Sequence, residues 1–435
     1  MYRRLIFFGF FILFNQVWSQ SVTLSNSNLP IVIITTALDP TTGQNLPIVD
    51  EPKVIATMKI IYRPDGSRNY VSDFNNAAYL NYNGLIGIEI RGSTSAGLPK
   101  KPYGFTTYLA DGVTDNNVSL LGMPSEHDWI LNALAFDESL IRDKFSYDLS
   151  RAMGNYAPRT RYCEVIINNQ YAGLYMLTEK IKVDANRVNI EKMNPLDNTS
   201  PAVTGGYITK ADKIGTDPVA WTMSSYGANS SMIHDTPKPE VVTSTQNAYI
   251  KRQFTLLDTL ARIVPSYSIV NGVPSVIDVP SFIDFMLSSE LASNVDSYQF
   301  SSYFHKDRNG KLRAGPIWDY NLTYGNDLKS WGYDRSLTNV WQFYNLNGLY
   351  YDNTGPKFWK GLYDNAVFKC YLTKRWQELT QAGAPMNYNI MVAKIDSLNT
   401  LVSEAAVREQ TKWQAIPNHA SDVALMKTWL SDRIT

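Results

Sequence analysis

The chain has 435 residues, of which 44% are hydrophobic and 18% charged, a balance typical of a folded globular protein and unlike that of a disordered chain. Its 40 lysines and arginines match its 40 aspartates and glutamates, so no overall field favours nucleic acid or anionic lipid as a partner. This length can build one large domain or two lobes.

Residues 1–19 predict a secretory signal peptide. Arg3 and Arg4 precede an apolar run over residues 5–14, and the small residue Ser19 follows at a plausible cleavage point. The run is too short for a membrane-spanning helix, which needs about 20 residues. The alternative is a buried N-terminal core helix. We expect a secreted or extracytoplasmic protein, at the cell surface or in the periplasm, with no membrane span after cleavage.

Residues 20–52 predict an N-terminal extension, polar except for the strand-like run IVIITT at 31–36. A β-rich lobe follows over about 53–210. Its strand-like segments alternate or carry β-branched residues, and NNQ at 168–170 predicts a hairpin turn. Apolar residues at helical spacing predict one helix, over 137–154, with a glycine at its end. The predicted strands are 53–63, 85–91, 102–109, the two arms of the hairpin within 162–181, and 206–210.

Residues 215–245 are rich in Ser, Thr and Asn and predict a long surface loop. Over about 246–435 the pattern becomes helical, and Asp278 followed by Pro280 predicts the start of one helix. A second hairpin is expected inside this part, because Asn309-Gly310 is a strong turn signal. The predicted fold class is α+β, with a β-rich N-terminal lobe and a mostly helical C-terminal lobe that contains an embedded hairpin.

Several polar residues are expected to be structural. Cys163 and Cys370 can form one bridge in an oxidising compartment or remain two buried thiols, and both options stay open. The four histidines lack the spacing of a helical zinc site, which disfavours a zinc enzyme, and His305 is expected to be packed. Asp137 is well placed as a helix N-cap, and Arg142 is expected to form an internal ion pair.

Two aspartates are the strongest candidates for chemistry. Asp296 follows a predicted helix and Asp319 follows the second hairpin, and the two can meet because antiparallel strands return the chain to where it started. With Asn294 and Asn321 they offer only hard oxygen ligands, which suit Mg²⁺, Mn²⁺ or Ca²⁺. One acid that orients a hydroxyl and another that holds a metal is the plan of a phosphotransferase. The alternative is that both acids are structural, one capping a turn and the other hydrogen-bonded in the core.

Several blocks of the chain, from about residue 54 onward, resemble the spore-coat protein H (CotH) kinase family. They are IEIRGSTSAGLPKKPYGFTTYL, LLGMPSEHDWILNALAFDESLIRDKFSYDLSRAMG, PRTRYCEVIINNQYAGLYMLTEKI, GGYITKAD, NVDSYQFSSYF and GKLRAGPIWDYNLTYGN. The resemblance implies a CotH kinase-like domain over 53–435, with an atypical protein-kinase-like fold that transfers the ATP γ-phosphate to protein hydroxyls using Mg²⁺ or Mn²⁺.

The same resemblance implies roles for individual residues. It gives Asp296 the catalytic position, and Asp319 and Asn321 the metal. The family's usual pattern here is Trp-Asp-x-Asp, so Asn321 removes one negative charge and is expected to weaken the metal site.

The resemblance also implies contacts to the nucleotide. In RGSTSAGLPKKPY, Arg91 and Lys101 become candidate phosphate ligands, and Lys101 is preferred to Lys100 because it directly precedes the next strand. Glu179, at the end of an apolar strand, is expected to anchor such a lysine or to bind the metal. The alternatives are a solvated surface loop and an exposed strand-end acid.

The sequence is compatible with three functions. A secreted, metal-dependent protein kinase acting on a secreted or surface protein is favoured. The alternative is a non-catalytic kinase-fold module that binds or scaffolds at the cell surface or in an extracellular assembly, which Asn321 favours. A third is a glycoside hydrolase that uses Asp296 and Asp319 as acid and base, with their carboxyls at least about 5 Å apart.

Overall fold

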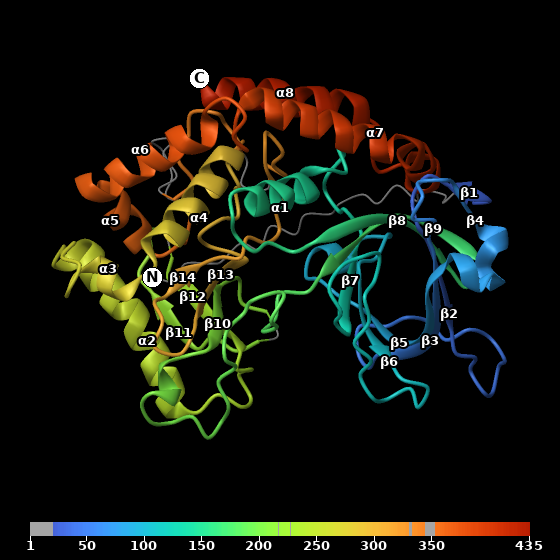
Figure 1. Ribbon diagram of the computed structural model, residues 1–435, viewed down its shortest axis with the longest axis horizontal. Coiled ribbons are helices and arrows are strands. Elements are labelled where there is room, and N and C mark those ends of the chain that lie inside the picture. Colours follow the sequence, from blue (N-terminus) through green and yellow to red (C-terminus); the bar gives the residue numbers. More distant parts are fainter. Residues whose placement is uncertain (1–20, 216, 227, 330–332, 344–352) are drawn as a thin grey trace, which may run out of the picture.

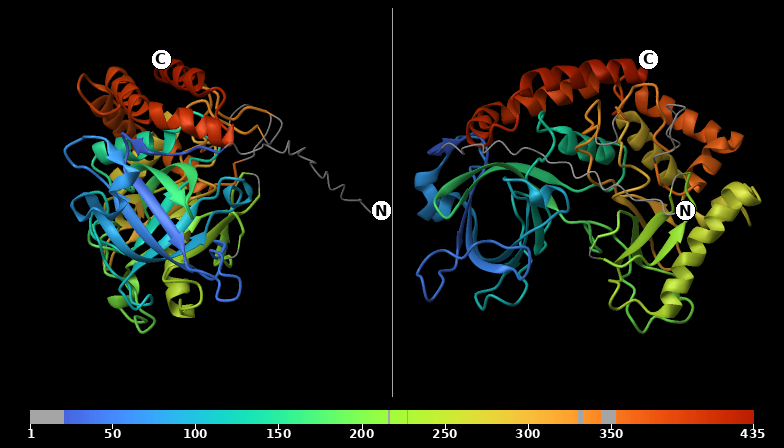
Figure 2. Two further views of the ribbon diagram at one scale, coloured as in Figure 1. Left: turned by 90° about the vertical axis from the view of Figure 1, so that its right-hand side faces the viewer. Right: turned by 180° about the vertical axis from the view of Figure 1, so that it is seen from behind.

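The computed structural model describes residues 21–435 apart from 216, 227, 330–332 and 344–352 (Figure 1). The predicted signal peptide at 1–19 lies outside the described residues. The described chain forms a closed β-barrel on one side and a second sheet packed against helices on the other (Figure 1). The two C-terminal helices run along the top of both parts, as the views in Figure 2 also show.

The barrel has the strand order β2-β3-β5-β6-β7-β9-β8. Neighbouring strands are antiparallel except β2 and β8, which are parallel and close the barrel with Ile31 opposite Glu164. Its strands are β2 (Ile31–Thr36), β3 (Val54–Ile61), β5 (Leu80–Ile90), β6 (Tyr103–Tyr108), β7 (Asp128–Asn132), β8 (Thr160–Ile167) and β9 (Gln170–Glu179). A separate short pair consists of β1 (Asn26–Ser27) and β4 (Asn69–Tyr70).

Buried and exposed side chains alternate along most of β3, as expected for a strand with one face toward the core. In β3, Ala56 and Met58 are buried while Thr57 between them is exposed, so one face of the strand fills the barrel interior. The predicted β8–β9 hairpin is confirmed, and its turn residues Asn168 and Asn169 adopt left-handed φ angles of 49° and 64°. Because β2 pairs with β3 and β8, the barrel begins inside the segment predicted as an N-terminal extension.

The second sheet has the order β11-β12-β10-β13-β14, formed by β11 (Trp221–Met223), β12 (Ser230–Thr236), β10 (Tyr207–Ala211), β13 (Ser302–Lys306) and β14 (Arg313–Ala314). The prediction of a long loop over 215–245 is wrong, because β11 and β12 lie within it. Trp221 and Met223 are buried around the exposed Thr222, and the Trp221 ring lies 5.5 Å from that of Phe254. The predicted second hairpin is confirmed as β13–β14, and it extends this sheet through β10.

The helices pack over this sheet and around the aromatic core. They are α2 (Ser244–Asp258), continued by a π turn over Thr259–Ile263, α3 (Val273–Val276), α4 (Val279–Ala292), α5 (Phe358–Asp364), α6 (Ala366–Thr380), α7 (Tyr388–Trp413) and α8 (His419–Ile434). Helix α4 begins as predicted, since the Asp278 side chain accepts a hydrogen bond from the Ser281 backbone nitrogen at 3.0 Å. Its Phe282 and Phe285 rings lie 5.2 and 5.3 Å from the Trp359 ring.

Helix α1 (Arg142–Ala152) begins later than the sequence predicted. The preceding residues form a turn in which Asp137 accepts a hydrogen bond from the Ser139 nitrogen at 3.0 Å, and Leu140 has a left-handed φ of 65°. The prediction that Asp137 is the N-cap is wrong, because Ile141 occupies that position. The expected structural role is confirmed, since Asp137 forms a buried ion pair with Arg142 at 2.6 Å.

The combination of two sheets with a separate helical region makes the chain α+β, as predicted. The two cysteines are free thiols and form no bridge, but only Cys163, in the barrel, is buried as expected; Cys370 is exposed on α6, so the prediction of a buried thiol is wrong there. Within the described residues, no helix combines the length and the apolar character that a membrane span requires.

Candidate active site

A pocket of about 570 Å³ lies where the barrel meets the second sheet. Both halves of the chain contribute to its wall. Arg91 follows β5, Asp143 belongs to α1, and Lys210 belongs to β10, while Asp296 follows α4 and Asp319 follows β14. The two aspartates predicted to meet therefore line one pocket.

Asp319 is held by its backbone and by its aromatic neighbours. Its φ of 61° lies in the left-handed region, which costs a non-glycine residue energy and is often found at functional sites. Its nitrogen donates to the Tyr147 hydroxyl at 3.1 Å, and the next nitrogen, that of Tyr320, donates to Asp143 at 2.7 Å. The Trp318 ring stacks on that of Tyr147 with centroids 6.0 Å apart. The apolar residues before Asp319 therefore anchor the segment that presents its carboxylate.

Three carboxyl groups at the pocket are poorly compensated. Burial, together with the nearby Asp319 carboxylate, raises the pKa of Asp143 to about 7. Burial and Asp319 likewise raise the pKa of Asp296 to about 6. The pKa of Asp319 is itself raised, first by burial. These carboxyls lack enough positive charge around them, which is the condition that a bound cation would relieve.

Three cations, Arg91, Lys210 and Lys213, line the pocket with these acids. The charge of Lys213 lowers the pKa of Asp319 and of Asp296, against the larger effect of burial. Burial lowers the pKa of Arg91, whose guanidinium lies 5.9 Å from the Trp318 ring and interacts with the Asp319 carboxylate. Burial would also lower the pKa of Lys210, but Tyr303 and Asp212 together raise it, with the lysine nitrogen 2.8 Å from Asp212. The pocket thus joins carboxylates with one guanidinium and two ammonium groups, the complement of a phosphate–metal complex.

Asn321 has one polar atom already in use. Its amide nitrogen donates to the Ala135 carbonyl at 3.0 Å, so its side-chain oxygen is the atom left for a cation. Together with the Asp319 carboxylate this gives an all-oxygen donor set, which fits Mg²⁺ or Mn²⁺ and does not suit zinc.

Two predicted nucleotide contacts lie elsewhere. The Lys101 nitrogen donates to the Ala96 carbonyl at 2.8 Å, and Lys101 is not among the residues that line the pocket. Its neighbour Lys100 pairs with Glu409 of α7 at 2.6 Å. Glu179 is also outside the pocket wall; it is fully buried and pairs with Arg159 at 3.0 Å. Of the three predicted nucleotide ligands, the structure brings Arg91 alone into the pocket.

Asp143 and Lys210 were missed by the sequence reasoning. Both lie inside blocks that carry the family resemblance, RDKF for Asp143 and YITKAD for Lys210. A signal was available for Asp143, because an aspartate on a helical face that is otherwise buried needs a specific partner. Lys210 gave a weaker signal, because a lysine at the end of a short strand is usually solvent-exposed.

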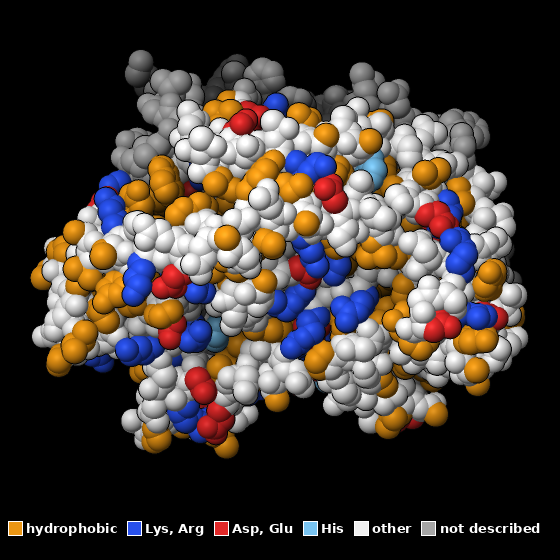
Figure 3. Space-filling model, turned by 45° about the horizontal axis from the view of Figure 1, so that its top comes forward, with side chains coloured by type: hydrophobic (Ala, Val, Ile, Leu, Met, Phe, Trp, Pro, Cys, Tyr) orange, Lys and Arg blue, Asp and Glu red, His pale blue; other side chains and the backbone are white. Residues whose placement is uncertain are grey.

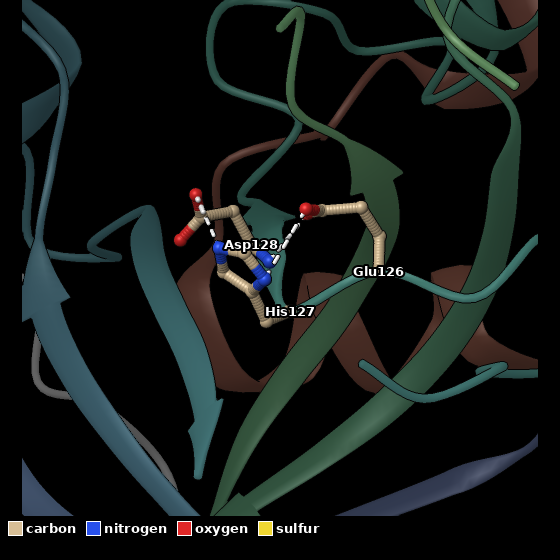
Figure 4. Close-up of side chains that lie close together, drawn as sticks. All are labelled: Glu126, His127 and Asp128. Carbon is tan, nitrogen blue, oxygen red and sulfur yellow. Dashed lines mark hydrogen bonds and ion pairs between the residues drawn. The ribbon is translucent and has the colours of Figure 1, made fainter. Parts of the chain in front are cut away.

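A second group of metal-type ligands lies at the edge of β7, where Glu126, His127 and Asp128 point toward one another (Figure 4). The Lys182 ammonium donates to Glu126 at 2.7 Å and to Asp128 at 3.0 Å, and lies 3.0 Å from the His127 ring nitrogen. Arg187 also approaches Glu126, at 3.3 Å. A lysine therefore occupies the place where a cation would compensate these acids, and the group is an internal ion-pair network.

A family model described as CotH kinase protein matches residues 88–435, which include Arg91, Asp143, Lys210, Asp296 and Asp319. The inner spore coat protein H of Bacillus subtilis (strain 168) is 24% identical to this chain over 251 residues. That match spans 56% of this chain and 60% of the relative's length.

Proposed function

The chain belongs to the CotH kinase protein family, and from this premise we propose that it is a metal-dependent protein kinase that transfers the γ-phosphate of ATP to protein hydroxyl groups. One observation carries the proposal. Asp296, Asp319 and the Asn321 side-chain oxygen share a pocket with Arg91 and Lys210, so general base, metal ligands and phosphate-binding cations are available in one place.

Asp319 and Asn321 are the residues that would hold Mg²⁺ or Mn²⁺. When bound, such a cation neutralises phosphate charge and stabilises the charge that develops during transfer. Arg91 and Lys210 bind phosphate oxygens, the guanidinium through paired N–H groups and the ammonium as a point charge. Their role is to align the γ-phosphate with the acceptor hydroxyl.

Asp296 acts as the base. Its carboxylate accepts the proton of the acceptor hydroxyl while the new P–O bond forms and the bond from the γ-phosphorus to ADP breaks. The pKa of Asp296, raised to about 6, still leaves the carboxyl mostly ionised at neutral pH and makes it a better proton acceptor than an ordinary aspartate. Asp143 and Tyr147 position the neighbouring segment through their bonds to the backbone of Tyr320 and Asp319.

The position of the pocket supports the proposal. The barrel side supplies Arg91, the helical side supplies Asp296 and Asp319, and the pocket lies between them. We assign the protein to an extracytoplasmic location, on the signal-like sequence at 1–19 and on the name of the relative, which is a spore coat protein. Its acceptor is then a secreted or surface protein.

The test is transfer of labelled phosphate. The purified protein is incubated with γ-labelled ATP, Mg²⁺ or Mn²⁺ and a generic serine-rich acceptor, and incorporated label is measured with and without a chelator. We expect label in the acceptor or in the protein itself, lost when the chelator removes the metal. Absence of label, together with no nucleotide-induced rise in melting temperature, would sink the proposal.

A second candidate is a non-catalytic module that keeps the pocket and binds a metal–nucleotide complex without transfer. Asn321 favours it, because the lost carboxylate weakens the metal site. The same experiment separates the two functions. A nucleotide-induced rise in melting temperature without incorporated label identifies the module, and label in the acceptor excludes it.

A further inference from the structure

A cluster of cations lies on a different part of the surface from the candidate active site. This basic patch consists of Lys144 and Arg151 on α1, Arg159 and Arg161 at the start of β8, and Lys394 on α7. None of the five lines the pocket that holds Asp296 and Asp319. In Figure 3, which turns the α7–α8 side toward the viewer, lysine and arginine side chains gather near the middle of the face.

The basic patch has too few carboxylates for its cations. Asp148 pairs with Lys394 at 2.8 Å and with Lys144 at 3.5 Å, and it also contacts Arg151. Glu179 pairs with Arg159 at 3.0 Å. Five cations therefore share two carboxylates, an excess of three positive charges on a chain whose net charge is zero.

Arg161 is the least compensated member. It is exposed, and its guanidinium donates to the backbone carbonyls of Leu121 at 3.1 Å and Thr160 at 2.9 Å. Among the described residues it has no carboxylate partner within ion-pair distance. Its charge is consequently available to a ligand from solution.

The five cations also act on one another. Burial lowers the pKa of Lys144 to about 8, and the charges of Lys394, Arg151 and Arg161 lower it as well, against the opposing effect of Asp148. Burial lowers the pKa of Arg151, and the charges of Arg159 and Arg161 lower it as well. Mutual destabilisation of this kind marks a site of positive potential, which an anion would stabilise.

We propose that the basic patch binds a phosphorylated segment of a protein, and that it thereby retains a substrate that has already accepted one phosphate. The inference rests on the proposed function, which makes phosphoproteins the product of this chain. Phosphate is favoured over carboxylate because three of the five cations are arginines, whose planar guanidinium pairs with phosphate through two parallel hydrogen bonds. Each phosphoserine carries a charge of about −1.5 to −2, so two of them balance the excess.

Arg159 directly precedes β8 and Arg161 lies at its second position, and both are close enough to Arg151 for their charges to act on its guanidinium. Helix α7 brings Lys394 to the same place, and Asp148 holds it there at 2.8 Å. The ligand-binding groups thus come from elements that the fold fixes relative to one another, which favours a site over a chance collection of mobile side chains.

The test uses fluorescence anisotropy with three labelled peptides of one flexible sequence, carrying two phosphoserines, two serines or two glutamates. Binding is measured without ATP, so that it is independent of transfer. The test variant is Arg161→Gln with Lys394→Gln, and the matched control is Lys251→Gln with Arg252→Gln, an exposed lysine and arginine on α2. Both variants lose two positive charges.

We expect the phosphoserine peptide to bind tightest, the test variant to weaken its binding about tenfold, and the control to bind as the parent does. Added salt weakens the interaction, because the charges of Arg161 and Lys394 are exposed. Equal binding of the three peptides, equal binding of the phosphoserine and glutamate peptides, or unchanged binding by the test variant would each overturn the proposal.

Failure of the phosphopeptide proposal can be distinguished from failure of the proposed kinase function. The test variant leaves every pocket residue in place, so its transfer to a peptide with a single acceptor serine is expected at the parental rate. A chain that transfers phosphate but does not prefer the phosphoserine peptide keeps the kinase proposal and loses this one. A chain that binds the phosphoserine peptide without transferring phosphate is a phosphoprotein-binding module.

Discussion

The Asn321 side chain has one polar atom in a hydrogen bond and one that can bind a cation. Its amide nitrogen donates to the Ala135 carbonyl, so an aspartate at this position would bring two oxygen acceptors face to face. The added negative charge would at the same time strengthen a site for a divalent cation. Asparagine therefore favours the metal-free fold, and aspartate favours the metal-bound site.

We predict that Asn321→Asp strengthens metal binding and lowers the stability of the metal-free protein. We expect the variant to need about tenfold less Mg²⁺ for half-maximal nucleotide binding, because a second carboxylate joins Asp319. Without metal we expect it to unfold at a lower temperature than the parent, because the bond to Ala135 is lost. Nucleotide titrations at varied Mg²⁺ and thermal unfolding in chelator measure the two effects. Tighter nucleotide binding in chelator would contradict the assignment.

Arg91 and Lys101 offer a direct comparison between neighbouring cations. Arg91 lines the pocket, whereas the Lys101 ammonium donates to a backbone carbonyl outside it. We expect Arg91→Met to weaken ATP binding by about ten- to hundredfold and Lys101→Met to change it by less than about threefold. Isothermal titration with both variants measures this. A larger loss at Lys101 would restore the role predicted for it from the sequence.

His305 gives a prediction about pH. Its Nδ1 donates to the Gly315 carbonyl at 2.9 Å, and burial lowers the pKa of His305 to about 4. Between that value and the ordinary value of about 6.5, the unfolded chain binds a proton that the folded chain does not. Stability contributed by His305 is therefore present above pH 6.5 and is lost as the pH falls toward 4.

We expect the free energy of unfolding of the parent to fall by up to about 1 kcal/mol per pH unit in this window through His305 alone. In His305→Asn, which cannot take up the proton, the slope is expected to be shallower by that amount. Urea unfolding at pH 7, 6 and 5 measures both proteins. Parallel pH profiles would show that His305 is not the group responsible.

Arg142 shows how one residue joins elements. Its side chain is buried, pairs with Asp137 at 2.6 Å and with Asp422 of α8 at 2.5 Å, and donates to the Thr323 carbonyl at 2.8 Å. It therefore links α1, α8 and the segment that follows Asp319. A neutral replacement leaves Asp137 buried without its counterion.

We expect Arg142→Met to lower the free energy of unfolding by about 3 kcal/mol or more. The control is Arg68→Met, which breaks the largely exposed pair with Glu404 and is expected to cost less than about 1 kcal/mol. Urea unfolding of both variants gives the comparison. Similar losses in the two would mean that burial of the Arg142 network contributes little to stability.

Elements with local signals could be predicted from the sequence. The Asn-Asn and Asn-Gly turns gave both hairpins, and Asp278 with Pro280 gave the start of α4. The closed barrel could not be predicted, because it depends on the parallel pairing of β2 with β8, which are more than a hundred residues apart. Within 215–245, β11 was missed because it is three residues long, too short for alternation to be recognised. The seven residues of β12 were missed because Met232, Ile233 and His234 are buried in succession, so that the strand does not alternate.

The same distinction applies to the candidate site. Asp296 and Asp319 could be expected together because a hairpin and one helix end link them within a short stretch of chain. Asp143 and Lys210 reach the pocket from α1 and β10, and their approach depends on how the barrel packs against the second sheet. Lys101 and Glu179 were assigned from their neighbours in sequence, which does not determine the direction in which a side chain points.

At the scale of the whole molecule, α7 connects the two halves. Its Glu409 pairs with Lys100 at 2.6 Å and accepts the Leu174 nitrogen at 2.8 Å, and its Trp413 donates to the Ala172 carbonyl at 2.9 Å. Helix α7 also packs against α8, and α8 in turn packs against α4. The pocket therefore lies between halves that a long helix holds together (Figures 1 and 2).

The proposed function requires that this pocket transfers phosphate with Asp296 as its base. The most direct measurement compares the rate of label transfer and the dissociation constant for Mg·ATP in the parent, in Asp296→Asn and in Asp396→Asn, an exposed acid on α7. We predict that Asp296→Asn loses about 10²- to 10⁴-fold in rate while binding nucleotide like the parent, and that Asp396→Asn is unchanged. Transfer at the parental rate by Asp296→Asn would contradict the account.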